Sequence, residues 1–288
     1  EQSRTMANLI SIKRRIKTAQ NVSKTTKAMQ MIAASKLKRA EDAALSSRPY
    51  VEKLTILSRS ISKKVDPFNL NEYMVLPKET SENLMIVIAP DKGLCGGLVT
   101  NLARQLLIFY RENKHTSFVT VGKKANGIIR FFGGENIASF DFGTTLPSYD
   151  AVYPLMSLVD DYFLGKKAQK VYILNSNFNS VFSQTPTVHN LLPVAFEEEE
   201  NKTGQTLFEP SADELIPGLI RHYLEMRLYQ SLLETYLSEQ AARMLAMQNA
   251  TDNAKDIIEE LRLLYNKTRQ EKITNEILDI AGGMYVTT

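Results

Sequence analysis

Near its end the chain runs without glycine or proline from Leu219 to Ala281: LIRHYLEMRLYQSLLETYLSEQAARMLAMQNATDNAKDIIEELRLLYNKTRQEKITNEILDIA. Glycine and proline interrupt helices most strongly, so this stretch predicts one helix of about 60 residues, roughly 90 Å long. Such a helix is longer than a domain of this size is wide, and we expect much of it to extend beyond any globular body. Its later half carries small or apolar residues at helical spacing: Ala254, Ile257, Leu261, Leu264 and Thr268.

The first part of the chain has the same character. No glycine precedes Gly93, and Pro49, which can kink a helix, is the only proline between Ala7 and Lys64. A stripe recurs at steps of three and four: Leu9, Ile12, Ile16, Ala19, Val22, Thr26, Met29, Ala33, Leu37, Ala40 and Ala44. Two long helices with narrow seams bury them best by pairing. We therefore expect a long antiparallel coiled coil of the N- and C-terminal helices.

The middle of the chain differs in kind. Short apolar runs predict strands at Leu84 to Ala89, Phe118 to Val121 and Val171 to Leu174. Helical patterns follow the first run as far as Asn113 and recur near 123–132 and 149–165. Strands that alternate with helices predict a central Rossmann-like α/β domain with a largely parallel sheet, so that the whole chain is of mixed α+β and α/β class.

These patterns divide the chain into three segments. We expect one half of the coiled coil at 6–65, the α/β domain at 66–210 and the other half of the coiled coil at 211–288. Within the middle segment, Asp66 to Asn83 and Glu197 to Thr206 are predicted to be exposed connections.

Composition narrows the possible functions. With 288 residues and 43% hydrophobic content, the chain can bury a substantial core. No window approaches eighteen uncharged apolar residues, so we expect no segment inserted in a membrane. Cys95 is the single cysteine, which excludes an internal disulfide and favours a reducing compartment.

The net charge of +3 conceals an asymmetry. Residues 1–64 carry 15 lysines and arginines against four acidic residues, whereas the rest of the chain is acidic overall. Such a basic segment favours an acidic partner: nucleic acid, anionic lipid or an acidic protein loop. Nucleic-acid binders usually place aromatic residues among their basic ones, and none occurs before Tyr50. The face opposite these charges is largely Ala, Thr and Met, which suits close packing on another helix better than insertion into lipid. We favour an acidic protein surface.

The candidate catalytic features are weak. The run DKGLCGG at 91–97 follows a predicted strand, but it lacks the Gly-Lys-Ser/Thr of a phosphate loop, and we interpret it as a tight turn. His115, His189 and His222 show no metal-ligand spacing, and Cys95 has no histidine near it in sequence. The acidic run Glu197 to Glu200 is interpreted as a solvated loop. We find no nucleophile, base and acid set, and expect neither a cofactor nor catalysis by this chain alone.

The sequence resembles the gamma subunit family of F-type ATP synthases along nearly its whole length. The resemblance is carried by IKRRI (12–16), TKAMQMIAASKL (26–37), DKGLCGG (91–97), LLP (191–193), FEP (208–210), SEQAARM (238–244), ATDNA (250–254), YNKTRQ (265–270) and ITNEI (273–277). The last two are the most specific, and all occur in the family's order.

This resemblance implies a central-stalk rotor that couples rotation of a membrane c-ring to ATP synthesis or hydrolysis on other subunits. Its implied partners are three alpha and three beta subunits, an epsilon-type subunit and the c-ring, with no nucleic acid. The implied location is the cytoplasmic face of a bacterial plasma membrane or, alternatively, the matrix side of the mitochondrial inner membrane.

The resemblance also implies roles for particular residues. Contacts with the beta subunits would come from Lys24, Lys27, Met29 and Lys36 near the base of the shaft and from Arg269 and Gln270 higher up. Support of the shaft would come from Glu239, Arg243, Thr274 and Glu276.

Two other classes of function stay open at this point. One is a basic coiled-coil protein that binds RNA or an anionic membrane surface. The other is an enzyme that uses the α/β domain on nucleotides, which the missing phosphate loop argues against.

Overall fold

The computed structural model describes residues 2–62, 71–195 and 211–285. They form two compact units. The two-helix unit comprises Glu1–Ile32 and Met244–Thr288, and the sheet unit comprises Ala33–Arg243. The boundaries of these units fall within the two long helices, α1 (Gln2–Ser62) and α5 (Ala212–Tyr285). The connection expected at Glu197 to Thr206 lies outside the described residues.

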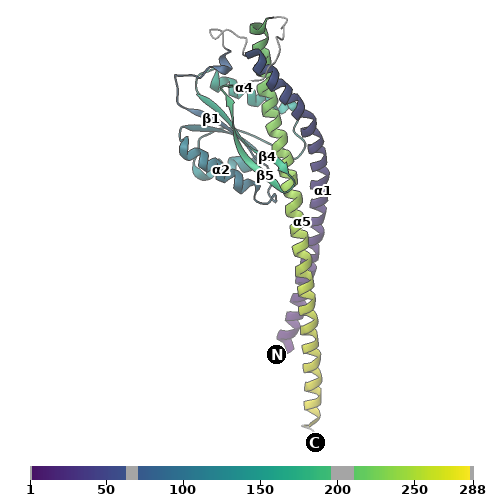
Figure 1. Ribbon diagram of the computed structural model, residues 1–288. Coiled ribbons are helices and arrows are strands. Elements are labelled where there is room, and N and C mark those ends of the chain that lie inside the picture. The colour runs from purple at the N-terminus through teal and green to yellow at the C-terminus, as the bar shows by residue number, and fades with distance from the viewer. Residues whose placement is uncertain (1, 63–70, 196–210, 286–288) are drawn as a thin grey trace. The chain divides into compact units, whose positions relative to one another are not determined.

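The sheet unit contains a five-stranded sheet with the strand order β3-β2-β1-β4-β5 (Figure 1). The strands are β1 (Asn83–Ile88), β2 (Thr116–Val121), β3 (Asn136–Phe140), β4 (Lys170–Ser180) and β5 (Ser183–Leu192). β1 pairs in parallel with β2 and β4, and β2 with β3, whereas β5 runs antiparallel to β4. The expected largely parallel sheet is therefore confirmed.

Helices α2 (Leu98–Glu112) and α3 (Lys123–Phe132) pack against one face of this sheet. Met85 and Val87 of β1 contact that layer, while the alternate residues Leu84, Ile86 and Ile88 point to the opposite face and are also fully buried. A strand covered on both faces is continuously apolar, which explains why β1 is evident in the sequence. Helix α5 contacts the sheet at β4, where Ser238 Oγ donates a hydrogen bond to the carbonyl of Ser176 at 2.9 Å.

The turn into α3 requires a glycine. Gly122 has φ of 99°, and a Cβ at this position would overlap the carbonyl oxygen of Ala89. The end of β1 and the start of α3 are therefore in backbone contact, which closes the carboxyl edge of the sheet around the loop that follows β1.

Two strands, β3 and β5, and the short 3-10 helix η2 (Glu72–Met74) are missed by the sequence patterns. The helical stretch expected near 149–165 contains the 3-10 helix η3 (Tyr149–Ala151) and then α4 (Val152–Phe163). The connection expected at Asp66 to Asn83 is described from residue 71 on, where the side chains are exposed or half-buried except for Tyr73. Tyr73 in η2 is buried, and its hydroxyl donates to Asp160 Oδ1 at 2.7 Å. Burial and the Asp160 hydrogen bond raise the pKa of Tyr73 to about 12.

Both long helices are continuous, and α1 continues through Pro49. The seam of α1 follows an unbroken alternation of three and four residues. Buried or half-buried residues stand at 9, 12, 16, 19, 23, 26, 30, 33, 37, 40, 44, 47, 51, 54, 58 and 61. In the two-helix unit the seam of α5 does the same at 247, 251, 254, 258, 261, 265, 268 and 272. This is the heptad spacing of a left-handed coiled coil.

For three residues the assignment to a buried stripe, made from the sequence, is wrong. Val22, Ile257 and Leu264 are 46%, 48% and 45% exposed. Ser23, Ile258 and Tyr265 hold the seam positions instead, each one residue further along. At Val22 the error has a physical cause, because a hydrophobic pattern favours valine over Ser23, whereas a tight seam accepts small polar residues. At Ile257 and Leu264 the neighbours Ile258 and Tyr265 are themselves large, so hydrophobicity does not distinguish the two registers.

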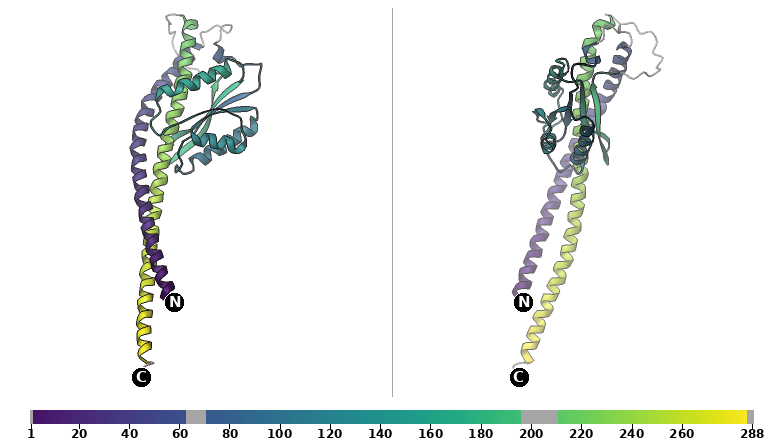
Figure 2. Two further views of the ribbon diagram at one scale, coloured as in Figure 1. Left: turned by 180° about the vertical axis from the view of Figure 1, so that it is seen from behind. Right: turned by 90° about the vertical axis from the view of Figure 1, so that its left-hand side faces the viewer.

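The two long helices contact each other within each unit. In the two-helix unit the hydroxyls of Thr26 and Thr251 lie 2.7 Å apart. In the sheet unit Ser47 Oγ donates to Gln230 Oε1 at 2.6 Å, and Tyr50 Oη lies 2.7 Å from His222 Nε2. From the first to the second of these sheet-unit contacts, the residue number rises from 47 to 50 along α1 and falls from 230 to 222 along α5. The two helices are therefore antiparallel in this unit, and they lie side by side in Figures 1 and 2.

Candidate functional site

The loop Asp91 to Gly97 lies at the carboxyl end of β1, the edge where open α/β sheets usually bind ligands. In this structure the carboxylate of Asp91 occupies that edge of the sheet. Asp91 Oδ1 accepts a hydrogen bond from Lys123 N at the start of α3, and Asp91 Oδ2 accepts one from Gly143 N, each at 2.8 Å. The N-terminus of α3, which lies at this edge of the sheet and could hold an anion, thus holds a carboxylate of the chain. This arrangement favours the tight turn over a nucleotide site.

Two of the residues named for shaft support, Glu239 and Arg243, attach this loop to α5. Arg243 Nη2 lies 2.6 Å from Glu239 Oε1 and also donates to the carbonyls of Lys92 and Gly93 at 3.3 and 3.2 Å. Glu239 is 4% exposed, and its Oε2 has no hydrogen-bond partner among the described residues. Burial therefore raises the pKa of Glu239, although Arg243 opposes the shift. The pair joins the helix to the α/β domain rather than to the other long helix.

Cys95 lies in the same loop and is buried, in contact with Leu98 and Ala242. Burial raises the pKa of its thiol, which makes it a poor nucleophile at neutral pH. Among the residues that the structure describes, no three His, Cys, Asp or Glu side chains gather as a metal site.

The basic residues of α1 in the two-helix unit are exposed. Lys24 and Lys27 lie at the surface, and Met29 is half-buried beside the seam. Among the described residues, Lys27 Nζ donates to Gln30 Oε1 of its own helix alone, at 3.2 Å. Within the described part of this unit, ion pairs join Lys255 to Asp252 and Lys272 to Glu276, both along α5, and none joins the two helices. The positive charge of α1 is therefore uncompensated by α5.

Lys36 differs from the other three residues of its expected group. It belongs to the sheet unit and is half-buried, and its Nζ donates to the carbonyl of Thr144 at 2.6 Å. An ammonium held by a carbonyl in the loop after β3 is less available to a partner than Lys24 or Lys27.

Arg269 and Gln270 form a second exposed group, on α5. Arg269 lies roughly 27 Å along the helix from Thr251, which contacts Thr26. The structure thus separates the two groups along the coiled coil rather than bringing them together. Near Gln270, Thr274 Oγ1 donates to its carbonyl at 2.9 Å, and Glu276 Oε1 lies 3.4 Å from Lys272 Nζ. Thr274 and Glu276 therefore interact with neighbours on their own helix.

The sequence patterns missed the polar contacts that hold α1 to α5 in the sheet unit. Glu234 is 8% exposed, and Arg48 donates to its Oε1 through Nε at 2.9 Å and Nη2 at 2.7 Å. A second group joins α4 to α5, since Arg221 Nη1 lies 2.7 Å from Asp160 Oδ2. The acidic residues within an apolar stretch of α5 were the available signal, but their partners are far away in sequence.

No helix within the described ranges is long and apolar enough to cross a membrane.

Comparison with known proteins identifies relatives of this chain and structures with the same architecture. A family model described as ATP synthase matches residues 8–285. The ATP synthase gamma chain of Dehalococcoides mccartyi is 40% identical over 282 residues, covering 96% of this chain and 98% of the relative. The gamma chain of Ruthia magnifica is 36% identical over 280 residues, covering 94% and 96%. Among solved structures, a chain of the Euglena gracilis mitochondrial ATP synthase has a TM-score of 0.71 at 19% identity, covering 98% of this chain and 95% of that one.

The structural likeness alone demonstrates the fold, whereas the identity over nearly the full length demonstrates kinship. The chain belongs to the ATP synthase gamma chain family.

Proposed function

We propose that this chain is the central-stalk rotor of an F-type ATP synthase and that it acts through two exposed groups on its coiled coil. It is not itself catalytic. Its partners are the alpha and beta subunits, an epsilon-type subunit and the c-ring. The observation that carries the proposal is the narrow two-helix unit, in which α1 presents basic side chains that α5 does not neutralise.

A shaft changes nucleotide affinity only if it contacts the three catalytic subunits differently. A single coiled coil inside a threefold ring does so at every angle, because each beta subunit faces another side of it. Each 1.4 kcal/mol of differential contact changes an affinity about tenfold. A few side chains at two heights are therefore enough.

The lower group consists of Lys24, Lys27 and Met29, which meet an acidic loop of a beta subunit. Lys36 contributes less, because the carbonyl of Thr144 holds its ammonium group. The upper group consists of Arg269 and Gln270, both exposed on α5. Thr274 and Glu276 stabilise the helix around Gln270 and Lys272, one turn before each of them, and Glu239 with Arg243 attaches the helix to the α/β domain.

The chain is a peripheral subunit of the membrane-bound complex. We assign it to the cytoplasmic face of a bacterial plasma membrane, because the curated relatives reported above are bacterial. The matrix side of the mitochondrial inner membrane is the alternative.

The upper group is tested by replacing Arg269 and Gln270 together with alanine in the assembled complex. Proton pumping per ATP hydrolysed should fall, or assembly should weaken, while Cys95→Ser should leave both unchanged. Arg262→Ala, another exposed arginine of α5, is the matched charge control. Equal and negligible effects of all three variants would remove Arg269 and Gln270 from the coupling surface.

The lower group is tested by charge. Replacing Lys24 and Lys27 by Glu places like charges against the acidic loop, so ATP turnover should slow, whereas replacement by Gln should have a smaller effect. Adding Lys36→Glu should also disturb the Thr144 contact and lower stability. Unchanged turnover in the first variant would mean that these lysines are merely solvated.

The broader assignment is tested by co-purification. The tagged chain should bring down two larger nucleotide-binding subunits, three copies of each for each copy of the chain. Salt-sensitive RNA binding at about micromolar affinity without those subunits would favour the basic coiled-coil alternative instead.

A further inference from the structure

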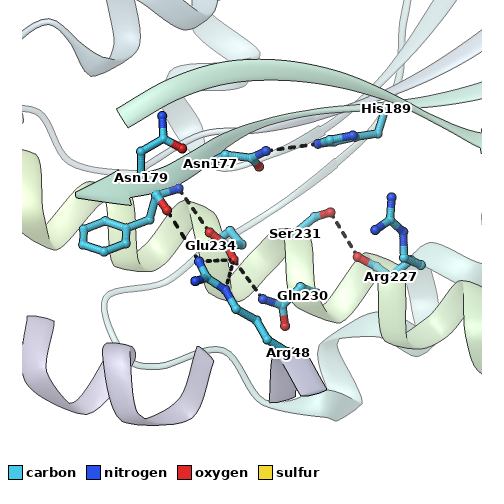
Figure 3. A pocket seen from close by; sticks show the side chains of 9 residues that line it. Arg48, Asn177, Asn179, His189, Arg227, Gln230, Ser231 and Glu234 are labelled. Atoms are coloured by element: carbon cyan, nitrogen blue, oxygen red, sulfur yellow. Dashed lines mark hydrogen bonds and ion pairs between the residues drawn. The ribbon is translucent and has the colours of Figure 1, made fainter. Parts of the chain in front are cut away.

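A cleft of about 270 Å³ lies between the β4–β5 hairpin, α5 and α1, entirely within the sheet unit (Figure 3). Its charged and imidazole side chains come from three elements, so the fold rather than one helix face creates it. The residues that matter here are Arg48, Asn177, His189, Arg227, Gln230 and Glu234.

The one carboxylate in this cleft is already fully engaged. Glu234 Oε1 accepts from Arg48 at 2.9 and 2.7 Å and from Gln230 Nε2 at 2.9 Å, and its Oε2 accepts from Phe178 N at 3.1 Å. Arg48 and Glu234 therefore neutralise each other, and Figure 3 shows their side chains meeting.

Arg227 is the second arginine that lines this cleft, and Glu234 does not pair with it. It is half-buried, and its guanidinium group makes no hydrogen bond or ion pair with any residue that the structure describes. A guanidinium group has five N–H donors, and partial removal from water without a partner is unfavourable. Such a group favours an anion.

His189 stands beside it with a defined proton. Asn175 Nδ2 donates to Asn177 Oδ1 at 2.9 Å, which leaves the Asn177 amide nitrogen as the donor to His189 Nε2 at 3.3 Å. The neutral imidazole then carries its proton on Nδ1 and can donate. Burial lowers the pKa of His189, and Arg227 lowers it further, while Glu234 opposes them.

We propose that this cleft binds a small oxoanion such as inorganic phosphate, with Arg227 as the main ligand and His189 as a second donor. The cleft lies below the roughly 300–1,000 Å³ of sites that enclose a drug-sized ligand, so it suits a single phosphate rather than a whole nucleotide. The inference is independent of the rotor role, because it needs only the isolated chain.

The experiment follows the imidazole NMR signals of the full chain during titration with sodium phosphate. The chain has three histidines, so His115 and His222 serve as internal controls. The His189 signal should shift saturably, and its pKa should rise, because a nearby anion stabilises the charged imidazole. Sodium chloride at the same ionic strength should produce neither change.

Substitution locates the site. Arg227→Gln should weaken phosphate binding at least about tenfold, and Arg227→Lys should retain part of the affinity. Arg262→Gln, an exposed arginine on the same helix, should bind as the wild type does. The thermal midpoint of each variant checks that it is folded, and Arg227→Lys carries the test if Arg227→Gln is not.

Three results would overturn the proposal. They are a phosphate response that does not saturate below about 10 mM, an equal response to chloride, and unchanged binding after replacement of Arg227. Failure of phosphate binding in a chain that still assembles with the alpha and beta subunits would leave the proposed function untouched.

Discussion

Helix α5 has two different environments along its length. In the sheet unit every residue from Ser231 to Ala242 is buried, including Glu234, Glu239 and Gln240. In the two-helix unit, from Asp252 to Leu278, only the heptad seam is buried or half-buried, and the remaining positions are exposed. One continuous helix is therefore an interior element at one end and one strand of a slender coiled coil at the other.

The difference shows how each region is held. The buried stretch is fixed by directional polar contacts, such as those of Glu234 with Arg48 and Arg243 with the carbonyls of Lys92 and Gly93. The two-helix unit relies on close packing of a narrow seam and on the pair Thr26 and Thr251. The first arrangement suits transmission of torque, and the second suits a shaft that presents its sides to partners.

The largest effect is expected in the buried stretch. Glu234→Ala should lower the free energy of unfolding by about 3 kcal/mol, because it leaves Arg48 and the Phe178 amide without their acceptor. Denaturant unfolding followed by circular dichroism measures it. Glu259→Ala, exposed on the same helix, should change the value by less than about 0.5 kcal/mol. Similar losses in both would remove the distinction between the two environments.

A seam residue should come next. Leu261 is 6% exposed and Leu263 is 68% exposed, although the two are chemically identical neighbours on α5. Leu261→Ala should cost about 2 kcal/mol, whereas Leu263→Ala should cost less than about 0.5 kcal/mol. The same unfolding experiment compares them, and the opposite order would place the seam on another face of the helix.

The threonine pair should contribute less. Thr26→Val and Thr251→Val should each cost about 1 kcal/mol, because each removes the hydrogen bond between the two hydroxyls, while the hydroxyl that stays keeps a carbonyl of its own helix. The double variant should lose less than the sum of the single losses, since the hydroxyls interact directly. Strict additivity would show that the two hydroxyls are independent, and that the coiled coil lacks this polar contact.

The smallest expected effect is a dependence on pH. Burial raises the pKa of Glu239 above its ordinary value of 4.5, so the folded chain holds this proton to higher pH than the unfolded chain does. As pH rises from 4.5, the wild type should therefore lose stability relative to Glu239→Gln, which cannot ionise. Below that pH the difference should be constant. Exposed Glu260→Gln is the control, and a wild type that gains stability relative to Glu239→Gln as pH rises would contradict the assignment.

The sequence predicts the long helices and the buried parallel strands well, because glycine-free stretches and continuous apolar runs are local signals. It does not predict β3 or β5, which end the sheet on its two sides. β5 contains Pro186 among polar residues, a composition that an edge strand tolerates and an interior strand does not. β3 is only partly buried, so its hydrophobic pattern is weak.

The candidate site is predictable only in part, for a similar reason. Exposed Lys24, Lys27, Arg269 and Gln270 were named through the resemblance, and their contacts with beta subunits stay predictions. Arg48 and Glu234 are separated by 186 positions in the chain, so no local pattern joins them. The restraint on Lys36 likewise depends on Thr144, which only the folded chain brings within reach.

The regular alternation of three and four residues along the seam has a mechanical consequence. Two helices that supercoil with a single handedness wind more tightly when they are twisted in one sense and unwind when they are twisted in the other. ATP synthesis and hydrolysis turn the rotor in opposite senses. The torsional stiffness of the shaft should therefore be greater in one direction of rotation than in the other. The spacing of the seam residues sets which direction this is, because it sets the handedness of the supercoil.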